Sequence, residues 1–329
     1  MTETKTGLMD VLRDGSWTKR FNFRLNYAVT LGLLILAVVI NAALQPTFFT
    51  QYSLTSNFAT FAPLVFAAIA QAIIIIGGGI DLSLGAQVAF ISVVTLRVMD
   101  GQDSRIWLGV ITALVTGAAC GALNGFIVAV IRLQPLIATF ATSSVFAGLA
   151  LVVLPTPGGA VPASMVSTYR MAVAAIPVPI LLVALGMLAW WAMSRTRYTR
   201  QLYAVGGNRE ASYASLVPVT SVTFRSFVFA SMFVGIAALT VLANTGSGDP
   251  FIGANMALDS IAAVVLGGIA LSGGRGSPFG AVAGALILAI SSNILFFLNV
   301  PTTYRALASG LIIIVALALS VMTTKRGKA

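Results

Sequence analysis

The residues whose chemistry stands out most from their surroundings lie in one glycine-rich stretch. The sequence GGGIDLS at residues 77–83 interrupts a long apolar region. Three consecutive glycines weaken a helix by roughly 1 kcal/mol each, and a carboxylate at the bilayer centre costs about 3 kcal/mol. Such a stretch is tolerated where its backbone and its carboxylate find partners, in a cavity or at a membrane face.

Two interpretations of this stretch remain open. One is a helix break at the membrane face, with Asp81 capping the helix that follows and Ser83 beside it. The other is a substrate site or gate. The residues of this signature loop are Gly78, Gly79, Asp81 and Ser83.

A second group consists of neutral polar and aromatic side chains within apolar segments. An ion or proton pump usually carries buried acids or bases along a relay, whereas amides, hydroxyls and aromatic rings suit an uncharged, hydroxyl-rich solute. The alternative for each residue is interhelical hydrogen bonding, worth about 0.6 kcal/mol. The candidate pathway residues are Asn57, Phe58, Phe61, Gln71, Asn124, Thr139, Thr142 and Asn293.

A polar segment, LYAVGGNREASYASL at residues 202–216, separates two apolar runs and follows three arginines within residues 195–200. A loop this basic beside a spanning helix belongs on the cytoplasmic side. Asn208 is placed to cap a short helix. This helix either docks on a soluble partner or simply connects two spans. Its first turn is expected to hold Arg209, Glu210 and Ala211.

Two further features lie at expected helix ends. Asp259 is placed as an N-cap or first-turn acid, where a negative charge is favourable to the helix dipole. Arg275 lies in the glycine-rich turn SGGRGSP at residues 272–278. It is either a contact for a cytoplasmic partner or lipid phosphate, or an anchor that fixes orientation.

The composition excludes several kinds of chemistry. The sequence contains no histidine and a single cysteine, Cys120. Histidine acid–base catalysis, an intramolecular disulfide and a cysteine-based metal cluster are therefore excluded, and we expect no metal site. No phosphate-binding loop of the form GxxxxGK[ST] is present, so ATP would have to bind to another chain. The net charge of +10 arises at helix ends, which argues against nucleic-acid binding.

The elements that must position these residues are membrane helices. With 58% hydrophobic and only 9% charged residues, the 329-residue chain is far more apolar than a soluble domain. We expect an all-α polytopic membrane protein with about ten spans, some short or broken. The expected spans are 28–44, 57–76, 83–99, 107–131, 136–154, 177–194, 222–243, 259–272, 278–298 and 304–322.

The distribution of charge supports this topology. With both termini in the cytoplasm, 15 of the 19 Lys and Arg residues fall on the cytoplasmic side. Residues 1–27 form a basic amphipathic segment with no cleavage site after the first span. Residues 28–322 form one permease domain with a cytoplasmic loop at 195–221, and residues 323–329 form a basic tail.

Small-residue spacing predicts close helix packing at two places. Gly117, Gly121 and Gly125 share one helix face, as do Gly280 and Gly284. The similar sequences GGIDLSLG and GGIALSGG are both expected on the cytoplasmic side, so they do not mark equivalent points of an inverted repeat.

Four motifs in order resemble one family, the permease subunits of bacterial ATP-binding-cassette (ABC) importers for ribose, xylose, galactofuranose and related monosaccharides. The motifs are GGGIDLSLGA (77–86), LNGFIVAVIRLQPLIATFAT (123–142), RTRYTRQLYAVGGNREASYAS (195–215) and LDSIAAVVLGGIALSGGRGSPFGAVAGALI (258–287).

The resemblance implies a non-enzymatic inner-membrane subunit that works by alternating access. It also implies a second permease copy, separate ATPase subunits that hold ATP and Mg²⁺, and a periplasmic sugar-binding protein. The residues that match the ATPase-coupling segment are Gly206, Gly207, Asn208, Arg209, Glu210 and Ala211. Pro218, a departure from the family pattern, is expected to end the coupling helix.

Three alternatives remain. The cargo could be a branched-chain amino acid or a nucleoside. The chain could be a stand-alone secondary transporter or channel, with the glycine run as a filter. A membrane-bound enzyme is the third, and the absence of histidine and of paired acids argues against it.

Overall fold

The structure, a computed structural model, describes residues 16–301 and residues 304, 307, 310 and 311, with side chains described from residue 28 onward. Most of the tenth expected span, the basic tail and residues 1–15 lie outside the described residues. Helix α2 begins at Ser16, so the helix of the first span starts within the basic amphipathic segment expected at residues 1–27.

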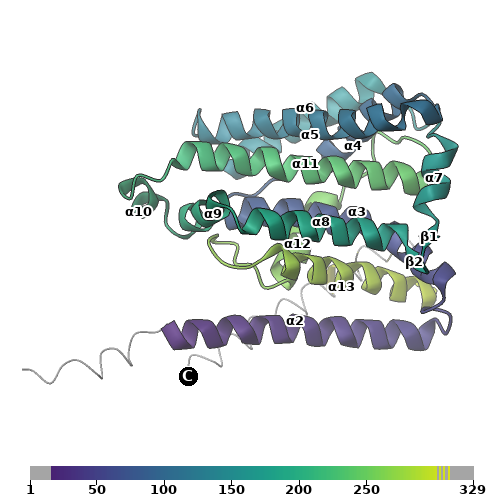
Figure 1. Cartoon of the computed structure of the whole chain (residues 1–329), viewed down its shortest axis with the longest axis horizontal. Coiled ribbons are helices and arrows are strands. Elements are labelled where there is room, and N and C mark those ends of the chain that lie inside the picture. Colours follow the sequence, from purple (N-terminus) through teal and green to yellow (C-terminus); the bar gives the residue numbers. More distant parts are fainter. Residues whose placement is uncertain (1–15, 302–303, 305–306, 308–309, 312–329) are drawn as a thin grey trace, which may run out of the picture.

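The chain folds as a bundle of helices that run nearly parallel or antiparallel to one another (Figure 1). A two-stranded hairpin, β1 (Ala172–Val173) and β2 (Ile176–Pro177), precedes α8. The helices are α2 (Ser16–Leu44), α3 (Gln51–Ile76), α4 (Leu84–Met99), the 3₁₀ turn η1 (Asp103–Arg105), α5 (Ile106–Ala129), α6 (Pro135–Val153), α7 (Ala163–Tyr169), α8 (Val178–Ser194), α9 (Arg197–Gly207), α10 (Arg209–Ala214), α11 (Val219–Thr245), α12 (Met256–Leu266) and α13 (Pro278–Phe297).

Helix lengths confirm an all-α polytopic membrane protein. In the described part of the chain, five helices are long and apolar enough to cross a bilayer, or six if the bent pair α8 and α9 counts as one span. Two shorter apolar helices, at residues 84–99 and 256–266, accompany them, together with the apolar part of α2 at residues 28–44. Among the described residues, nine of the ten expected spans thus coincide with helices, and up to six of these pass as full-length spans.

Helix α3 is the centre of the bundle. It is apolar on all sides and almost wholly buried, as expected for a helix surrounded by other helices. Helix α11 packs against α3 on one side and α5 on the other. The glycine spacing on α5 explains the second contact: a side chain at Gly117 or Gly121 would collide with the carbonyl oxygen of Ser231 or Phe227 of α11.

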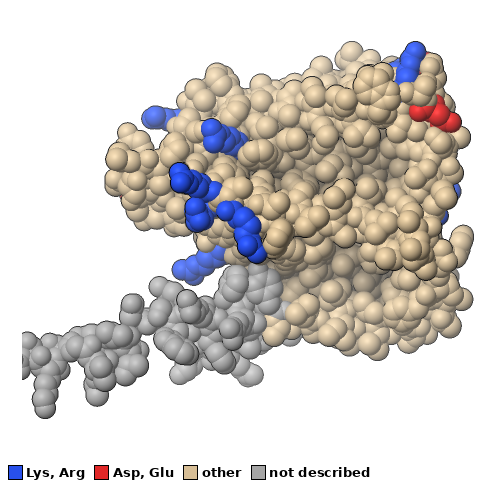
Figure 2. All heavy atoms as spheres, viewed as in Figure 1, with Lys and Arg blue, Asp and Glu red and all other residues tan. Residues whose placement is uncertain are grey.

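The two ends of the bundle differ in charge. On the face drawn in Figure 2, Lys and Arg side chains gather at the end that carries α9 and α10. We call this the basic end. Acidic side chains show on that face only at the opposite end, which carries α7 and the β1–β2 hairpin. The arginines of the basic end are Arg132, Arg195, Arg197, Arg200, Arg209, Arg225 and Arg275.

Candidate solute pathway and coupling site

The signature loop is a helix break, as the glycine run predicted. Helix α3 ends at Ile76, and Gly78 adopts a left-handed conformation with φ of 85°. Its N–H donates to the carbonyl of Ile75 at 2.9 Å, and that of Gly79 donates to the carbonyl of Ile74 at 3.0 Å. These bonds satisfy carbonyls that a helix end would otherwise leave without partners.

Asp81 is fully buried and is the centre of a hydrogen-bond network. Its Oδ1 accepts from the backbone N–H of Ser83 at 2.7 Å and from the Ser83 hydroxyl at 2.6 Å, and its Oδ2 accepts from Gln87 Nε2 at 2.9 Å. The capping prediction needs correction, because the N-cap of α4 is Ser83. Asp81 instead holds the N–H of that residue from two positions upstream.

Four candidate pathway residues extend this network and are buried. Asn124 Nδ2 donates to the Ser83 hydroxyl at 2.8 Å, and the Thr142 hydroxyl donates to Asn124 Oδ1 at 2.6 Å. The Thr139 hydroxyl accepts the N–H of residue 82 at 3.0 Å. With its amide oriented to satisfy both atoms, Gln71 bridges the backbone N–H and C=O of residue 81, each at 3.2 Å. Gln71, Asn124 and Thr139 therefore hold the signature loop directly, and Thr142 supports it through Asn124.

The other four candidates lie away from this loop. Asn293 Nδ2 donates to Asn57 Oδ1 at 3.4 Å, and the rings of Phe58 and Phe61 are 5.9 Å apart. Asn57 in turn donates to the Gln45 side chain at 3.5 Å, close to the end of α2. The eight residues thus form two groups, and their part in moving a solute remains a prediction.

The coupling segment consists of two helices, not one. Helix α9 bends by 82° from α8, and α10 follows it directly. The Asn208 cap is confirmed, because its side chain accepts from the N–H of Ala211 at 2.9 Å. Helix α10 ends at Ala214, so Pro218 does not end it and serves instead as the N-cap of α11.

The tip of this segment projects from the basic end (Figure 1). Gly207, Asn208, Arg209, Glu210 and Ala211 are all exposed there. Two large apolar side chains that the sequence analysis missed accompany them: Tyr213 is 76% exposed and Leu216 is 92% exposed. Exposed apolar groups together with charges are typical of a surface that binds another protein.

The other side of α9 packs on the two helix breaks. Gly206 contacts the carbonyl oxygen of Ile76, at the end of α3, and the backbone of Gly274, between α12 and α13. Gly274 donates its N–H to the same Ile76 carbonyl at 2.9 Å, and the Tyr203 hydroxyl donates to the carbonyl of Gly276 at 2.6 Å. We call this meeting of three glycine-rich segments the glycine junction.

The second break repeats the geometry of the first. At the end of α12 the N–H of Gly268 donates to the carbonyl of Val265 at 3.0 Å, and that of Ile269 donates to the carbonyl of Val264 at 3.2 Å. Gly268 has a φ of 77°, close to that of Gly78. The two similar sequences therefore encode the same helix ending. Gly78 corresponds in structure to Gly268, although an alignment of GGIDLSLG with GGIALSGG pairs Gly78 with Gly267.

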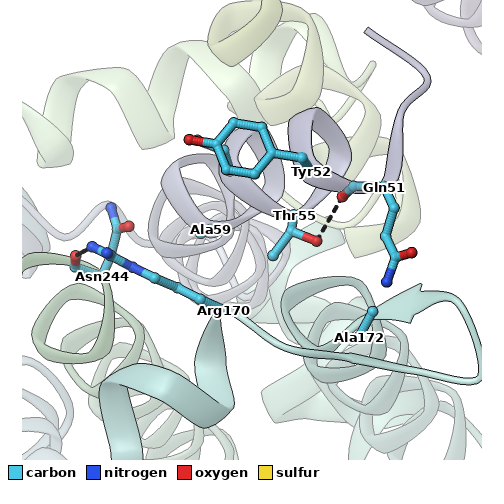
Figure 3. Close-up of a pocket in the computed structure, with 8 residues that line it drawn as sticks. Gln51, Tyr52, Thr55, Ala59, Arg170, Ala172 and Asn244 are labelled. Carbon is cyan, nitrogen blue, oxygen red and sulfur yellow. Dashed lines mark hydrogen bonds between the residues drawn. The ribbon is translucent and has the colours of Figure 1, made fainter. Parts of the chain in front are cut away.

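A polar pocket of about 620 Å³ opens at the opposite end of the bundle (Figure 3). Arg170 crosses its wall and donates to the backbone carbonyl of Asn244 at 2.9 Å. None of its residues was singled out from the sequence, because they come from three separate segments. The pocket is lined by Gln51, Tyr52, Thr55, Ser56, Ala59, Arg170, Ala172 and Asn244.

Apolar spanning helices, polar breaks within them and a projecting basic tip define a polytopic membrane transport protein. Residues 53–317 match the family described as "Branched-chain amino acid transport system / permease component", and the chain belongs to this family.

Curated relatives align over most of their length. The chain is 30% identical to the D-allose transport system permease of Escherichia coli, over 96% of this chain and 98% of that protein. It is 33% identical to the ribose import permease of Bacillus subtilis, over 88% and 90%. It is 31% identical to the fructose import permease of Rhizobium meliloti, over 89% and 84%. No solved structure gives a significant match.

Proposed function

We propose that this chain is the transmembrane permease subunit of a bacterial ABC importer that moves a monosaccharide or a similar polyhydroxylated solute by alternating access. The named relatives transport allose, ribose and fructose, which supports a sugar as the cargo. The chain itself makes and breaks no covalent bond. Other subunits hydrolyse ATP with Mg²⁺ and drive the transport cycle.

The orientation follows from charge. Loops rich in Lys and Arg remain in the cytoplasm, so the basic end faces the cytoplasm of the bacterial inner membrane. Both termini lie on that side when ten segments cross or enter the bilayer. The end that carries α7 and the polar pocket of Figure 3 then faces the periplasm, where a sugar-binding protein docks.

The glycine junction is the observation that carries this proposal. The exposed tip at residues 207–211 and the half-buried Gly206 occupy consecutive positions of one short segment. A push on the tip by an ATPase subunit is therefore transmitted at once to the end of α3 and to the loop between α12 and α13. A second permease copy completes the complex, and the solute passes between or beside the moving breaks.

The coupling role is tested by reversing two charges of the tip. Arg209→Asp with Glu210→Arg is expected to leave the protein in the membrane but to abolish ATP-driven uptake in vesicles that contain the complete importer. Arg132→Asp, an exposed charge of the basic end outside the segment, serves as the control. Normal uptake by the double variant would remove the case for the coupling role.

A branched-chain amino acid is the second candidate cargo, because the family description names it. A zwitterion needs a cation as well as an anion in the membrane, and the described spans offer no arginine or lysine near their centres. Uptake of radiolabelled ribose, allose, fructose and leucine by the assembled importer separates the two. Uptake by this chain alone, driven by a gradient, would instead identify a stand-alone transporter.

A further inference from the structure

Helix α12 begins inside the membrane and not at its surface. Its 11 residues rise about 16 Å, whereas the hydrocarbon core is about 30 Å thick. Its last residue, Leu266, precedes the glycine junction at the basic end. Its first residue, Met256, therefore lies near the middle of the bilayer.

A non-helical segment, residues 246–255, connects the end of α11 to the start of α12. Gly248 pairs with Gly158 at the opposite end of the bundle, and the chain then descends to Gly253, which packs against Gly85 in the first turn of α4. Irregular backbone at this depth is tolerated only where protein buries it or where it lines a water-filled cavity. Part of the segment is exposed in the single chain, including Phe251.

Two polar side chains mark the exposed face of α12. Asn255 is exposed and Asp259 is half-buried. Four residues apart, they lie on one side of the helix with the exposed Leu258. In the described part of the chain, no cation or hydrogen-bond donor contacts the Asp259 carboxylate. An unpaired carboxylate at this depth cannot face lipid, because ionisable groups there turn toward the protein or water.

A pocket of about 290 Å³ lies beside the start of α12, where it is lined by Ala254 and Ala257, the neighbours in sequence of Asn255 and Leu258. Its walls combine the non-helical segment at residues 246–255, the start of α4 after the signature loop, and two hydroxyl residues of α6, Ser143 and Ser144. Ser144 is exposed and forms no hydrogen bond with the described residues, so its hydroxyl is open to a solute. The full lining is Leu82, Gly85, Ala86, Ala89, Ser143, Ser144, Ala147, Pro250, Phe251, Ile252, Ala254 and Ala257.

We propose that the α12 face formed by Asn255 and Asp259, with the adjoining pocket, is the polar wall of the solute passage and binds the hydroxyl groups of the cargo. The Asp259 carboxylate accepts hydrogen bonds from hydroxyls, and the Asn255 amide both donates and accepts. This inference rests on the proposed function and adds the place where the sugar is held. It selects neutral, hydroxyl-rich solutes and disfavours anions.

The single cysteine makes a direct test possible. In a Cys120→Ala background, single cysteines are introduced at Asn255, Leu258 and Asp259 and exposed to a membrane-impermeant thiol reagent. Leu188→Cys, on the exposed side of α8, is the lipid-facing control. Because a thiolate reacts only where water reaches it, we expect labelling at the α12 positions at least ten times faster than at residue 188 in one state of the ATP cycle.

Protection and transport complete the test. Saturating D-ribose, D-allose or D-fructose, whichever the assembled importer takes up, should slow the labelling at α12 several-fold. Asp259→Asn should raise the sugar concentration for half-maximal uptake about tenfold, whereas Asp100→Asn, an exposed carboxylate at the periplasmic end and outside the pocket, should leave it unchanged.

The outcomes separate this inference from the proposed function. Labelling at α12 no faster than at residue 188, in an importer that does take up sugar, would overturn the passage and leave the function intact. A complete importer that takes up none of the three sugars contradicts the proposed function, and fast labelling at α12 in that importer still supports a water-lined passage.

Discussion

Gly206, near the end of α9, packs its backbone directly on the carbonyl oxygen of Ile76, the last residue of α3. A hydrogen atom is the only side chain that fits between them. The contact joins a segment that projects from the basic end to the helix that forms the core of the bundle. Ile76 lies five residues before Asp81 in the sequence. A movement of α9 is therefore passed to the signature loop through a short stretch of backbone.

Gly206→Ala should disrupt this contact. A methyl group would collide with the Ile76 carbonyl, and overpacking of this kind costs about 1–3 kcal/mol. We expect a lower melting temperature of the purified protein in detergent and slower ATP-driven uptake. Gly207→Ala is the matched comparison for stability, because its methyl group would meet no atom within 4 Å. Equal melting temperatures for the two variants would contradict the packing argument.

Ser83→Ala should destabilise the signature loop. The Ser83 hydroxyl bonds to Asp81, Gln87 and Asn124, and its removal leaves buried polar groups without one partner each. Such a loss costs about 1–3 kcal/mol, measurable as a shift in thermal unfolding. Ser194→Ala, which removes an exposed hydroxyl bonded only to the Trp191 carbonyl, should unfold like the wild type. A stable Ser83 variant would argue that water replaces the hydroxyl.

Tyr213→Ala should weaken assembly with the ATPase subunit. A large aromatic side chain at the centre of an interface typically contributes more than 1 kcal/mol, or about a fivefold to tenfold change in affinity. Binding of the detergent-purified permease to its ATPase subunit measures this directly. Phe49→Ala removes a similarly exposed ring at the opposite end and should leave the affinity unchanged. Unaltered binding by the Tyr213 variant would exclude that side chain from the interface.

The short helix α7 should lose its hydrogen bonds to Asp103 at acidic pH. Ser164 donates two hydrogen bonds to the Asp103 carboxylate, at 2.7 and 3.1 Å, and these bonds hold the pKa of Asp103 below its usual value. The bonds are therefore intact at neutral pH and are lost as the pH falls through this lowered pKa. Hydrogen exchange in α7, corrected for the intrinsic pH dependence, should increase there. In Ser164→Ala this additional increase should be absent.

Local features of this protein were predictable from sequence. The Asn208 cap, the helix break at Gly78 and the close packing at Gly117 and Gly121 are each signalled by residues within one or two helical turns of the sequence. The membrane class followed from composition, because only spanning helices can satisfy the backbone of so apolar a chain.

The roles of the buried polar residues were not predictable in the same way. Gln71, Asn124, Thr139 and Thr142 were expected to line a solute pathway. The structure shows the first three bonded to the backbone or side chains of residues 81–83, and Thr142 bonded to Asn124. A polar side chain within a span needs a partner in either case. The sequence does not reveal whether that partner is a solute, water or another segment of the same chain.

The sequence by itself determined that the chain is a helical membrane protein, where its helices break, and which end is basic, because hydropathy, caps and charges act over short distances. Only the tertiary structure decided that Gly206 meets the end of α3 and the α12–α13 loop, and that the segment before α12 packs on Gly85. Those features join segments that are far apart in the sequence. They depend on how whole helices pack against one another and on the space that glycine leaves between them.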